Sequence, residues 1–287
     1  MHIFKSIGIA LSIIGAFHQL PGHAQTLRSY SDLGKALADP TSVKWVELHS
    51  DTLQTFPNEL FLFPNIQYLD LSNSGIRSIP DNIAQLKNLK SLNLSGTAVQ
   101  ELPASLDKLS ALTSIRLSYL PNLDLSSTLP VLSRIPSLKN IDLKYDNINT
   151  LPPTIQLLQQ VETLDLSGNP LTNLPEEFGA LRGLKRLYLN DDAYLNFEEA
   201  ISVLQRIPSL SELHLENDRI RQVPSNIQNL QNLEYLYLNQ NDIKLLPNSI
   251  QDMRSLQYLD VDHNPILTPD GFDFQPSPTI KINFGNR

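Results

Sequence analysis

The chain of 287 residues contains no cysteine. This absence excludes disulfide bonds, zinc sites with thiolate ligands, a thiol nucleophile and a lipid attached through cysteine. An exported protein without disulfides must be held together by its hydrophobic core alone, which a long repeat array can supply.

Basic residues are also scarce, since 22 Lys and Arg stand against 30 Asp and Glu, for a net charge of −8. Binding to a phosphate backbone requires clustered basic side chains that release counterions. The acidic balance therefore argues against nucleic acid as a partner.

The chain has one long apolar run, from Ile7 to Phe17, preceded by Lys5 and followed by Pro21-Gly-His-Ala24. This order of basic, apolar and small residues is typical of a secretory signal peptide, here residues 1–24 with cleavage after Ala24. The alternative is a membrane anchor, but 11 residues fall short of the ~20 that span a bilayer. We expect no membrane span and a protein that is secreted, periplasmic or held at the cell surface.

Signatures of catalysis are missing as well: the sequence has no G-x-S-x-G, no H-E-x-x-H and no phosphate-binding loop. We therefore predict that the chain is not an enzyme and uses no cofactor. His214 with Glu216, and Asp260 with Asp262 and His263, could be interpreted as metal ligands. Solvated polar positions explain them more simply, because residues two apart on a strand lie nearly ~7 Å from each other.

What the sequence does contain is a leucine pattern that repeats every 23 or 26 residues. The gaps between repeat starts follow the order 23, 23, 26 from the second start onward, which relates every third repeat by 72 residues. The ten starts are Val43, Ile66, Leu89, Leu112, Leu138, Val161, Leu184, Leu210, Leu233 and Leu256.

Each repeat combines a short alternating segment with a return that begins at Leu-Pro. In the repeat from Val161, Leu164 and Leu166 alternate with polar residues as a strand requires, and Leu174-Pro175 starts the return because proline cannot pair in a sheet. Periods of 20 to 29 residues with this core mark leucine-rich repeats. The sequence predicts an α/β solenoid, a horseshoe of about ten leucine-rich repeats with a parallel sheet on the concave face and short helices or 3-10 turns on the convex face.

One position after each strand, the bend position, is polar in nine of ten repeats, so its side chain can bond backbone groups that no strand satisfies. Leu120 is the exception, and we expect a modified bend there. The two 26-residue repeats should carry longer helices, one of them opened by Asn196-Phe-Glu-Glu199 and running from about Phe197 to Arg206. The bend residues are Asp51, Ser74, Thr97, Leu120, Asp146, Asn169, Asp192, Asp218, Asn241 and Asn264.

The repeats need covers at both ends. Leu33, Ala36 and Leu37 have helical spacing and suit an N-terminal cap, whereas Ile280, Ile282 and Phe284 alternate and suggest a closing strand after the loop 268–278. The predicted organisation is a signal peptide at 1–24, an N-terminal cap at 25–40, repeats at 41–267 and a C-terminal cap at 268–287.

The Leu-Pro returns, such as Leu102-Pro-Ala-Ser-Leu-Asp-Lys-Leu109, resemble the class of leucine-rich repeats found in Ras-pathway scaffolds and many bacterial proteins. The segment from Tyr30 to Leu48 is similar to the start of exported leucine-rich repeat proteins of Bacteroidetes and spirochaetes. The resemblance covers about Tyr30 to Leu267 and implies a bacterial interaction module. Bacterial effectors that are ubiquitin ligases share the Leu-Pro signature but use a cysteine-bearing domain, which this chain lacks.

Strand side chains that point away from the core form the concave face, and most tyrosines fall there: Tyr68, Tyr119, Tyr145, Tyr188, Tyr235, Tyr237 and Tyr258, with Trp45. Tyrosine suits solvated strands, but it also suits an interface, and the pattern alone leaves both readings open. Clustering in the last four repeats favours a ligand-binding patch there. Its predicted residues are Tyr188, Glu212, His214, Tyr235, Tyr237, Tyr258 and Asp260.

We expect the chain to be a monomer that binds a protein or peptide through this patch without catalysis. The alternative is a cell-envelope structural protein that binds polysaccharide or peptidoglycan, since tyrosine-rich strands also suit sugars.

Overall fold

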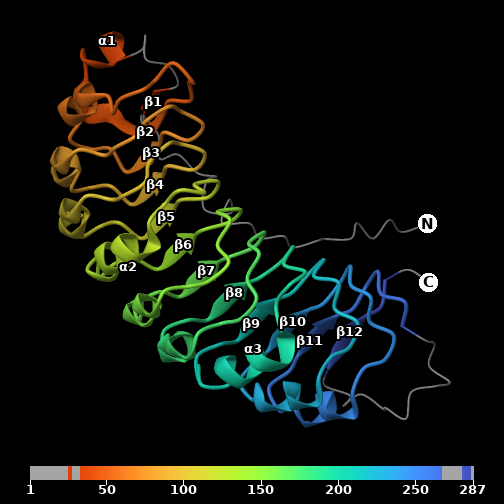
Figure 1. The fold of residues 1–287 in the computed structure, drawn as a ribbon. Helices are drawn as coiled ribbons and strands as arrows, with labels where there is room; N and C mark the ends of the chain where they lie inside the picture. Colours follow the sequence, from red (N-terminus) through yellow and green to blue (C-terminus); the bar gives the residue numbers. More distant parts are fainter. Residues whose placement is uncertain (1–24, 28–32, 267–279, 286–287) are drawn as a thin grey trace, which may run out of the picture.

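The computed structural model describes residues 25–27, 33–266 and 280–285. Its strands form one sheet in which each strand pairs in parallel with the next in sequence, from β1 to β12. Figure 1 shows the coils stacked into an arc, with the strands along one side and the helices along the other. The strands are β1 (Gln25–Leu27), β2 (Val43–Glu47), β3 (Tyr68–Asp70), β4 (Ser91–Asn93), β5 (Ser114–Arg116), β6 (Asn140–Asp142), β7 (Thr163–Asp165), β8 (Arg186–Tyr188), β9 (Glu212–His214), β10 (Tyr235–Tyr237), β11 (Tyr258–Asp260) and β12 (Lys281–Asn283).

The predicted solenoid is confirmed. The structure also confirms which residues of each strand face the core and which face away from it. Leu236 and Leu238 are fully buried, whereas Tyr235 and Tyr237 are half-buried on the opposite side of the strand. The buried aliphatic side chains form one continuous core along the coils. Stacking each coil on the next therefore removes from water the apolar surface that a single repeat would expose.

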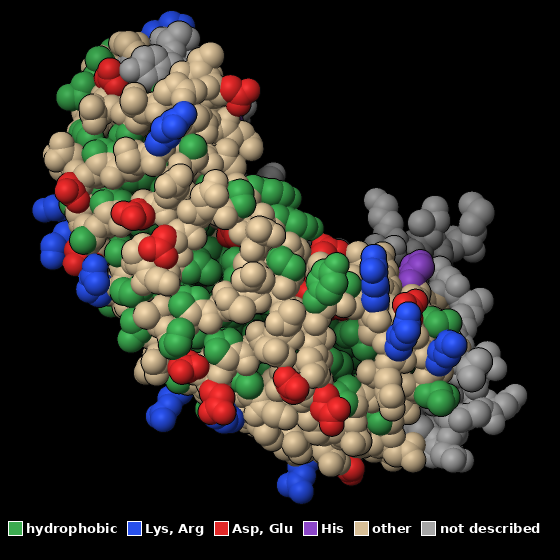
Figure 2. Space-filling model, viewed as in Figure 1, with side chains coloured by type: hydrophobic (Ala, Val, Ile, Leu, Met, Phe, Trp, Pro, Cys, Tyr) green, Lys and Arg blue, Asp and Glu red, His purple; other side chains and the backbone are tan. Residues whose placement is uncertain are grey.

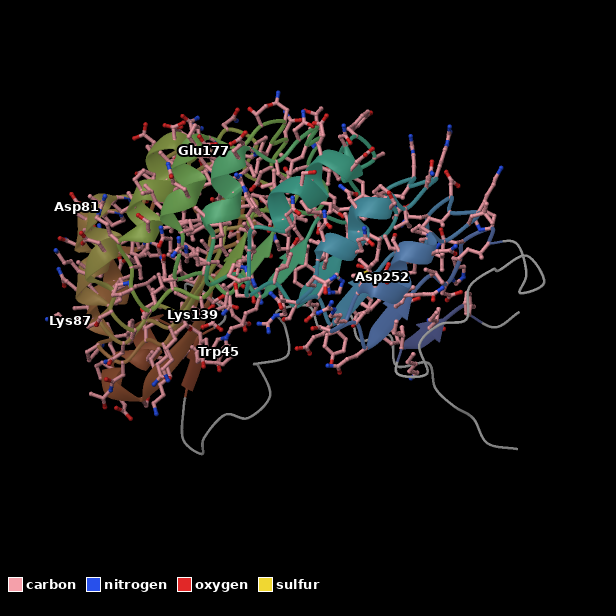
Figure 3. The ribbon with its side chains drawn as sticks, turned by 90° about the horizontal axis from the view of Figure 1, so that it is seen from below. Trp45, Asp81, Lys87, Lys139, Glu177 and Asp252 are labelled. Carbon is pink, nitrogen blue, oxygen red and sulfur yellow. The ribbon has the colours of Figure 1, made fainter. Side chains whose placement is uncertain are left out.

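Most returns are 3-10 helices. Seven of these helices begin directly after a proline that Leu, Ile, Val or Phe precedes. In one such return the carbonyl of Pro80 accepts a hydrogen bond from the amide of Ile83, which closes a single tight turn. Figure 3 shows Trp45 on the side of the strands and Asp81 and Glu177 on the side of these turns. The 3-10 helices are η3 (Pro40–Ser42), η4 (Asn58–Leu62), η5 (Asp81–Gln85), η6 (Ala104–Lys108), η7 (Pro153–Leu157), η8 (Glu176–Ala180), η9 (Ser225–Asn229) and η10 (Asn248–Asp252).

Both 26-residue repeats carry α-helices, as predicted. Helix α3 (Phe197–Leu204) begins after Asn196, whose side chain accepts a hydrogen bond from the amide of Glu199 at 3.3 Å. Helix α2 (Leu125–Ser133) starts in the same way, because Asp124 accepts from the amide of Ser126 at 2.9 Å. These caps satisfy amides that the first turn of a helix leaves without partners.

The ends contain one expected strand and one unexpected strand. Strand β12 lies where Ile280, Ile282 and Phe284 predicted it, and it pairs with β11; the predicted loop 268–278 lies outside the described residues. At the other end the short helix α1 (Leu33–Ala36) is present, but β1 also extends the sheet beyond β2, and the sequence did not predict it. The predicted signal peptide lies outside the described residues.

The bend position bonds the coils to one another. Asn169 accepts hydrogen bonds from the amides of Asp146 and Ile148, both at 3.0 Å, and donates to two carbonyls. At the exceptional Leu120, the side chain is buried, and the amide is bonded by the carboxylate of Asp146 at 2.7 Å, just as the amide of Asp146 is bonded by Asn169. Leu120 thus receives the usual bond from the next repeat, but its apolar side chain cannot make one to the repeat before it.

Candidate functional site

The register of the sheet brings the predicted site residues together. Tyr188, His214, Tyr237 and Asp260 occupy directly paired positions on β8 to β11. The position two residues earlier on the last three strands holds the remaining members, because Glu212, Tyr235 and Tyr258 are paired in the same way. We call these seven residues the concave patch.

Aromatic rings in the concave patch stack along the sheet. The ring centroids of Tyr188 and His214 are 4.1 Å apart, and those of His214 and Tyr237 are 4.2 Å apart with an interplanar angle of 6°. The ring of Tyr258 follows at 5.6 Å in a tilted orientation. Adjacent strands lie about 4.8 Å apart, so paired positions on a parallel sheet set rings at stacking distance.

His214 is the centre of the stack and is only 5% exposed. Its Nε2 lies 2.8 Å from a carboxylate oxygen of Glu212, and its Nδ1 lies 3.0 Å from one of Glu216. Burial lowers the pKa of His214, but the hydrogen bonds and charges of both glutamates outweigh it and raise the pKa. Two carboxylate acceptors require a proton on each ring nitrogen, so the geometry fits an imidazolium ion.

The hydroxyls of Tyr188, Tyr237 and Tyr258 remain protonated well above neutral pH, because burial raises the pKa of each. Burial, with the nearby charge of Glu212, raises the pKa of Tyr188 to about 12. Burial and Asp260 raise the pKa of Tyr258 to about 12 as well, and its hydroxyl donates to Asp260 at 3.1 Å. The patch therefore presents hydrogen-bond donors beside carboxylates.

The middle of the concave face is different, because small polar residues and ion pairs occupy it. The Lys144 ammonium lies 3.4 Å from Asp142 and 3.5 Å from Asp165, and the Ser118 hydroxyl donates to Asp142 at 2.5 Å. Burial raises the pKa of Asp165, and Lys144 opposes that rise. The ammonium of Lys144 therefore offsets the repulsion between the two aspartates.

Two tyrosines assigned to the concave face lie at its edge instead. Tyr119 and Tyr145 follow β5 and β6 in turns with positive φ values of 59° and 56°. Their rings stack at 5.0 Å, and the Tyr145 hydroxyl donates to Asp191 at 2.8 Å. The ring of Tyr145 lies over Gly168, where a Cβ atom would come within 2.2 Å of it. These aromatic contacts depend on the turn conformation, which strand periodicity does not reveal.

A second stack lies at the other end of the sheet, where Trp45 and Tyr68 pair on β2 and β3 with ring centroids 4.2 Å apart. The sequence placed both on the concave face but did not predict their contact. Stacking could have been anticipated from the repeat register, since aromatic residues at paired positions in successive repeats must become neighbours.

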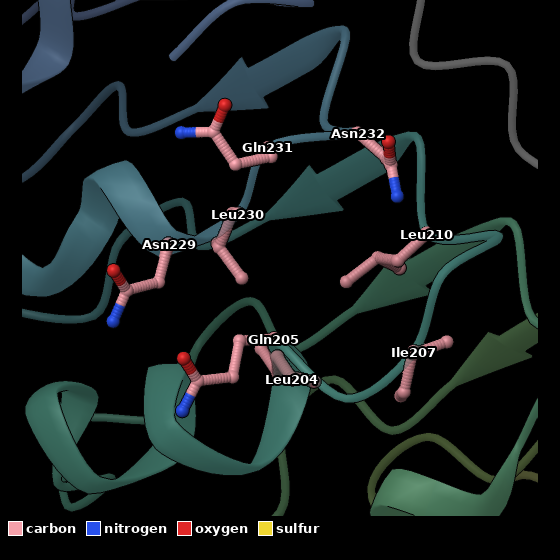
Figure 4. A pocket seen from close by; sticks show the side chains of 8 residues that line it. All are labelled: Leu204, Gln205, Ile207, Leu210, Asn229, Leu230, Gln231 and Asn232. Atoms are coloured by element: carbon pink, nitrogen blue, oxygen red, sulfur yellow. The ribbon is translucent and has the colours of Figure 1, made fainter. Parts of the chain in front are cut away.

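Hollows away from the sheet are small or open. One of about 90 Å³ lies between the end of α3 and η9, lined by Leu204, Gln205 and Leu230 among others (Figure 4). It has room for only a few water molecules. A shallower groove of about 460 Å³ runs beside the start of α3, with Leu195, Ile220 and Arg221 in its lining.

Charged side chains of both signs are scattered over the face drawn in Figure 2. Within the described residues, no group of three or more His, Cys, Asp and Glu has the arrangement of a metal site. Among the same residues, no helix combines the length and the apolar character needed to cross a bilayer.

The family model for leucine rich repeats matches residues 41–99, 64–123, 136–193 and 208–266. The chain belongs to the leucine-rich repeat family. Repeats of this family typically serve as protein-binding modules and are usually non-catalytic. No curated protein matches the chain.

Solved structures with the same fold include two bacterial proteins. An internalin from Listeria monocytogenes is 18% identical, with 86% of this chain and 82% of that chain covered and a TM-score of 0.58. The leucine-rich repeat domain of the type III effector XopL is 25% identical, with 82% and 80% covered and a TM-score of 0.61. TLR13, solved in complex with ssRNA13, is 24% identical, with 92% of this chain but 36% of that chain covered and a TM-score of 0.64.

Proposed function

We propose that this leucine-rich repeat protein binds a protein or peptide segment through the concave patch, without catalysis. The observation that carries the proposal is the stack of Tyr188, His214 and Tyr237, fixed by Glu212 and Glu216. A stack held on both sides loses little side-chain entropy when a ligand docks, and tyrosines of this kind act as interface anchors.

The chemistry of the patch favours a ligand segment with a basic side chain. Glu212 and Glu216 are matched by His214, but Asp260 interacts with the neutral donors of Tyr258 and Asn283. A lysine or arginine of the ligand would complement Asp260, and its stem would pack beside the tyrosine rings. We expect no nucleic-acid ligand, because the chain is acidic.

The second candidate is a cell-envelope protein that binds polysaccharide or peptidoglycan, and the Trp45–Tyr68 stack favours it. Sugars usually bind against the open face of an aromatic ring. In the concave patch, both faces of His214 and one face each of Tyr188 and Tyr237 are covered by neighbours. The patch therefore presents ring edges and hydroxyls, which suit a peptide better than a sugar ring.

The proposed setting is a bacterial protein that is exported after cleavage behind Ala24, and that acts as a monomer in the periplasm, on the cell surface or in the medium. The basis is the apolar run from Ile7 to Phe17 and the Leu-Pro repeats. A mass spectrum of the protein from fractionated cells tests it, with Gln25 expected at the amino terminus. An intact Met1 in the exported fraction would contradict the cleavage.

Binding is tested by comparing two triple variants on a glycan array and in a pull-down with identification of the captured chain. In the first variant Tyr188, Tyr235 and Tyr237 are replaced by alanine. The matched control replaces three tyrosines outside the patch: Tyr119, Tyr145 and Tyr194. We expect a captured protein that the control retains and the patch variant loses, with a fall in affinity of at least ~100-fold, since truncated anchors cost about 2 kcal/mol or more each.

A ligand held equally by both variants would contradict the patch as the binding site. Retention of a glycan that depends on the patch, with no protein lost, would favour the envelope alternative instead.

A further inference from the structure

Neutral side chains at the bend position share one hydrogen bond. Each donates to the backbone carbonyl three residues earlier, as Ser74 does to Leu71 at 2.7 Å and Thr97 does to Leu94 at 2.7 Å. The pattern holds for hydroxyls and amides alike, so this position requires a donor. The other examples are Asn169 to Leu166, Asn241 to Leu238 and Asn264 to Val261.

Asp146, Asp192 and Asp218 occupy the same position and are buried, with 5%, 2% and 5% of their surfaces exposed. One carboxyl oxygen of each accepts a backbone amide: Leu120 for Asp146, Tyr194 for Asp192 and Asp192 for Asp218. The other oxygen, Oδ2, is buried without a hydrogen-bond partner in all three. An ionised carboxylate has no donor to offer the carbonyl that the neutral residues satisfy.

We propose that Asp146, Asp192 and Asp218 are protonated in the folded chain and donate their carboxyl O–H to the carbonyl three residues earlier, which makes the solenoid more stable in acid. The three acids then reproduce the bond that Ser74, Thr97 and the asparagines make. The corresponding carbonyls are those of Leu143, Leu189 and Leu215. Those of Leu143 and Leu215 already accept from the side-chain amides of Asn169 and Asn241 and would accept a second bond, as the carbonyl of Leu238 does from Asn241 and Asn264.

The electrostatic surroundings act in the same direction. Burial raises the pKa of Asp146 to about 7, that of Asp192 to about 6 and that of Asp218 to about 8, and it outweighs the backbone amide bonds, which act in the opposite direction. The charged groups near them are acidic: Asp142 acts on Asp146, and Asp192, Asp191 and Glu216 act on Asp218. Arg219 follows Asp218 and is exposed, and it lines the same groove beside α3. A buried acid near other acids keeps its proton.

The sign of the pH dependence follows from these raised pKa values. Below the ordinary pKa of 3.8, the folded and unfolded chains both carry the protons, and stability does not change with pH. As the pH rises further, only the unfolded chain ionises, and the folding equilibrium weakens by about tenfold per pH unit for each aspartate. The loss ends for each residue once the pH passes its pKa in the folded chain.

The three buried aspartates lie at defined places in the repeat array. Asp146 and Asp218 are equivalent in the 72-residue period, and each bonds the amide of a bend residue 26 positions earlier, across a long repeat. Asp192 and Asp218 lie four residues after Tyr188 and His214. The acid-sensitive bonds are therefore concentrated where the two α-helical repeats join their neighbours, and two of them lie beside the concave patch.

The test replaces the three aspartates by asparagine and follows unfolding from about pH 4 to about pH 8, the window that the raised pKa values define. Asparagine supplies a permanent donor, so we expect the triple variant to unfold at a higher temperature than the parent chain above about pH 6, with a much weaker pH dependence. The matched control is Asp252→Asn, because Asp252 is exposed on η10; it should keep the parent's pH dependence.

A second measurement needs no variant. The carboxyl carbon shifts of Asp146, Asp192 and Asp218 in the parent chain should titrate between about pH 6 and about pH 8, far above an ordinary aspartate. Midpoints near about pH 4, or a triple variant whose pH dependence equals that of Asp252→Asn, would overturn the proposal.

Discussion

The concave patch and the middle of the concave face share one backbone but satisfy their polar groups differently. In the middle, Lys144 forms ion pairs with both Asp142 and Asp165 within the protein. In the patch, His214 is closed between two glutamates, whereas the tyrosine hydroxyls and Asp260 face the open side of the sheet. The solenoid supplies the same register in both regions, so any difference in binding between them must come from their side chains.

The largest expected effect tests whether the core beneath the two regions is equivalent. Leu213 lies under the patch and Leu164 under the middle, and both are fully buried. We expect each leucine-to-alanine change to lower the free energy of unfolding by about 2–5 kcal/mol, through lost burial and the cavity left behind. Denaturant unfolding of both variants measures it. A cost at one site several times that at the other would show that the repeats do not share one uniform core.

A smaller effect is expected from removing the positive charge of His214, which is present in the patch and absent from the middle of the face. His214→Gln removes a charged donor from between Glu212 and Glu216, and we expect a loss of about 1–3 kcal/mol in acid. Because the pKa of His214 is raised in the folded chain, its contribution is complete below the ordinary pKa of 6.5 and is lost as the pH rises through the folded pKa.

The control is His263→Gln, since the side chain of His263 is 71% exposed beside Asp262. Unfolding at several pH values should show a pH-dependent loss for the first variant and almost none for the second. If both variants lost stability with the same pH dependence, the prediction that a protonated His214 stabilises the patch would be wrong.

An effect of similar size concerns the middle of the face. Lys144→Met leaves the buried Asp142 and Asp165 without their cation, and we expect a loss of about 1–3 kcal/mol in the free energy of unfolding, since partial exposure of the lysine reduces the cost of breaking a buried pair. The variant should bind the patch ligand as tightly as the parent chain in the pull-down, because the ion pair serves stability. Weaker binding would extend the ligand surface beyond β8 towards β6.

The repeating leucine pattern was sufficient to predict which side of each strand is buried, as the buried Leu236 and the half-buried Tyr235 show. It could not predict β1, because Gln25-Thr-Leu27 is too short to show alternation. It assigned Tyr145 to the concave face, whereas the turn after β6 redirects that ring over Gly168. The site residues were brought together by register, but the contacts of His214 depend on rotamers that periodicity does not encode. Whether the patch binds a ligand stays a prediction.

The 72-residue period also makes the length of this protein adjustable. Each block of three coils begins and ends at the same position of the repeat. At the end of each long coil, an aspartate of the next coil accepts a hydrogen bond from the preceding bend residue: Asp146 from Leu120, and Asp218 from Asp192. A duplicated block would thus meet its neighbours with donors and acceptors already matched, so lineages could lengthen the arc by whole triplets without redesigning a junction.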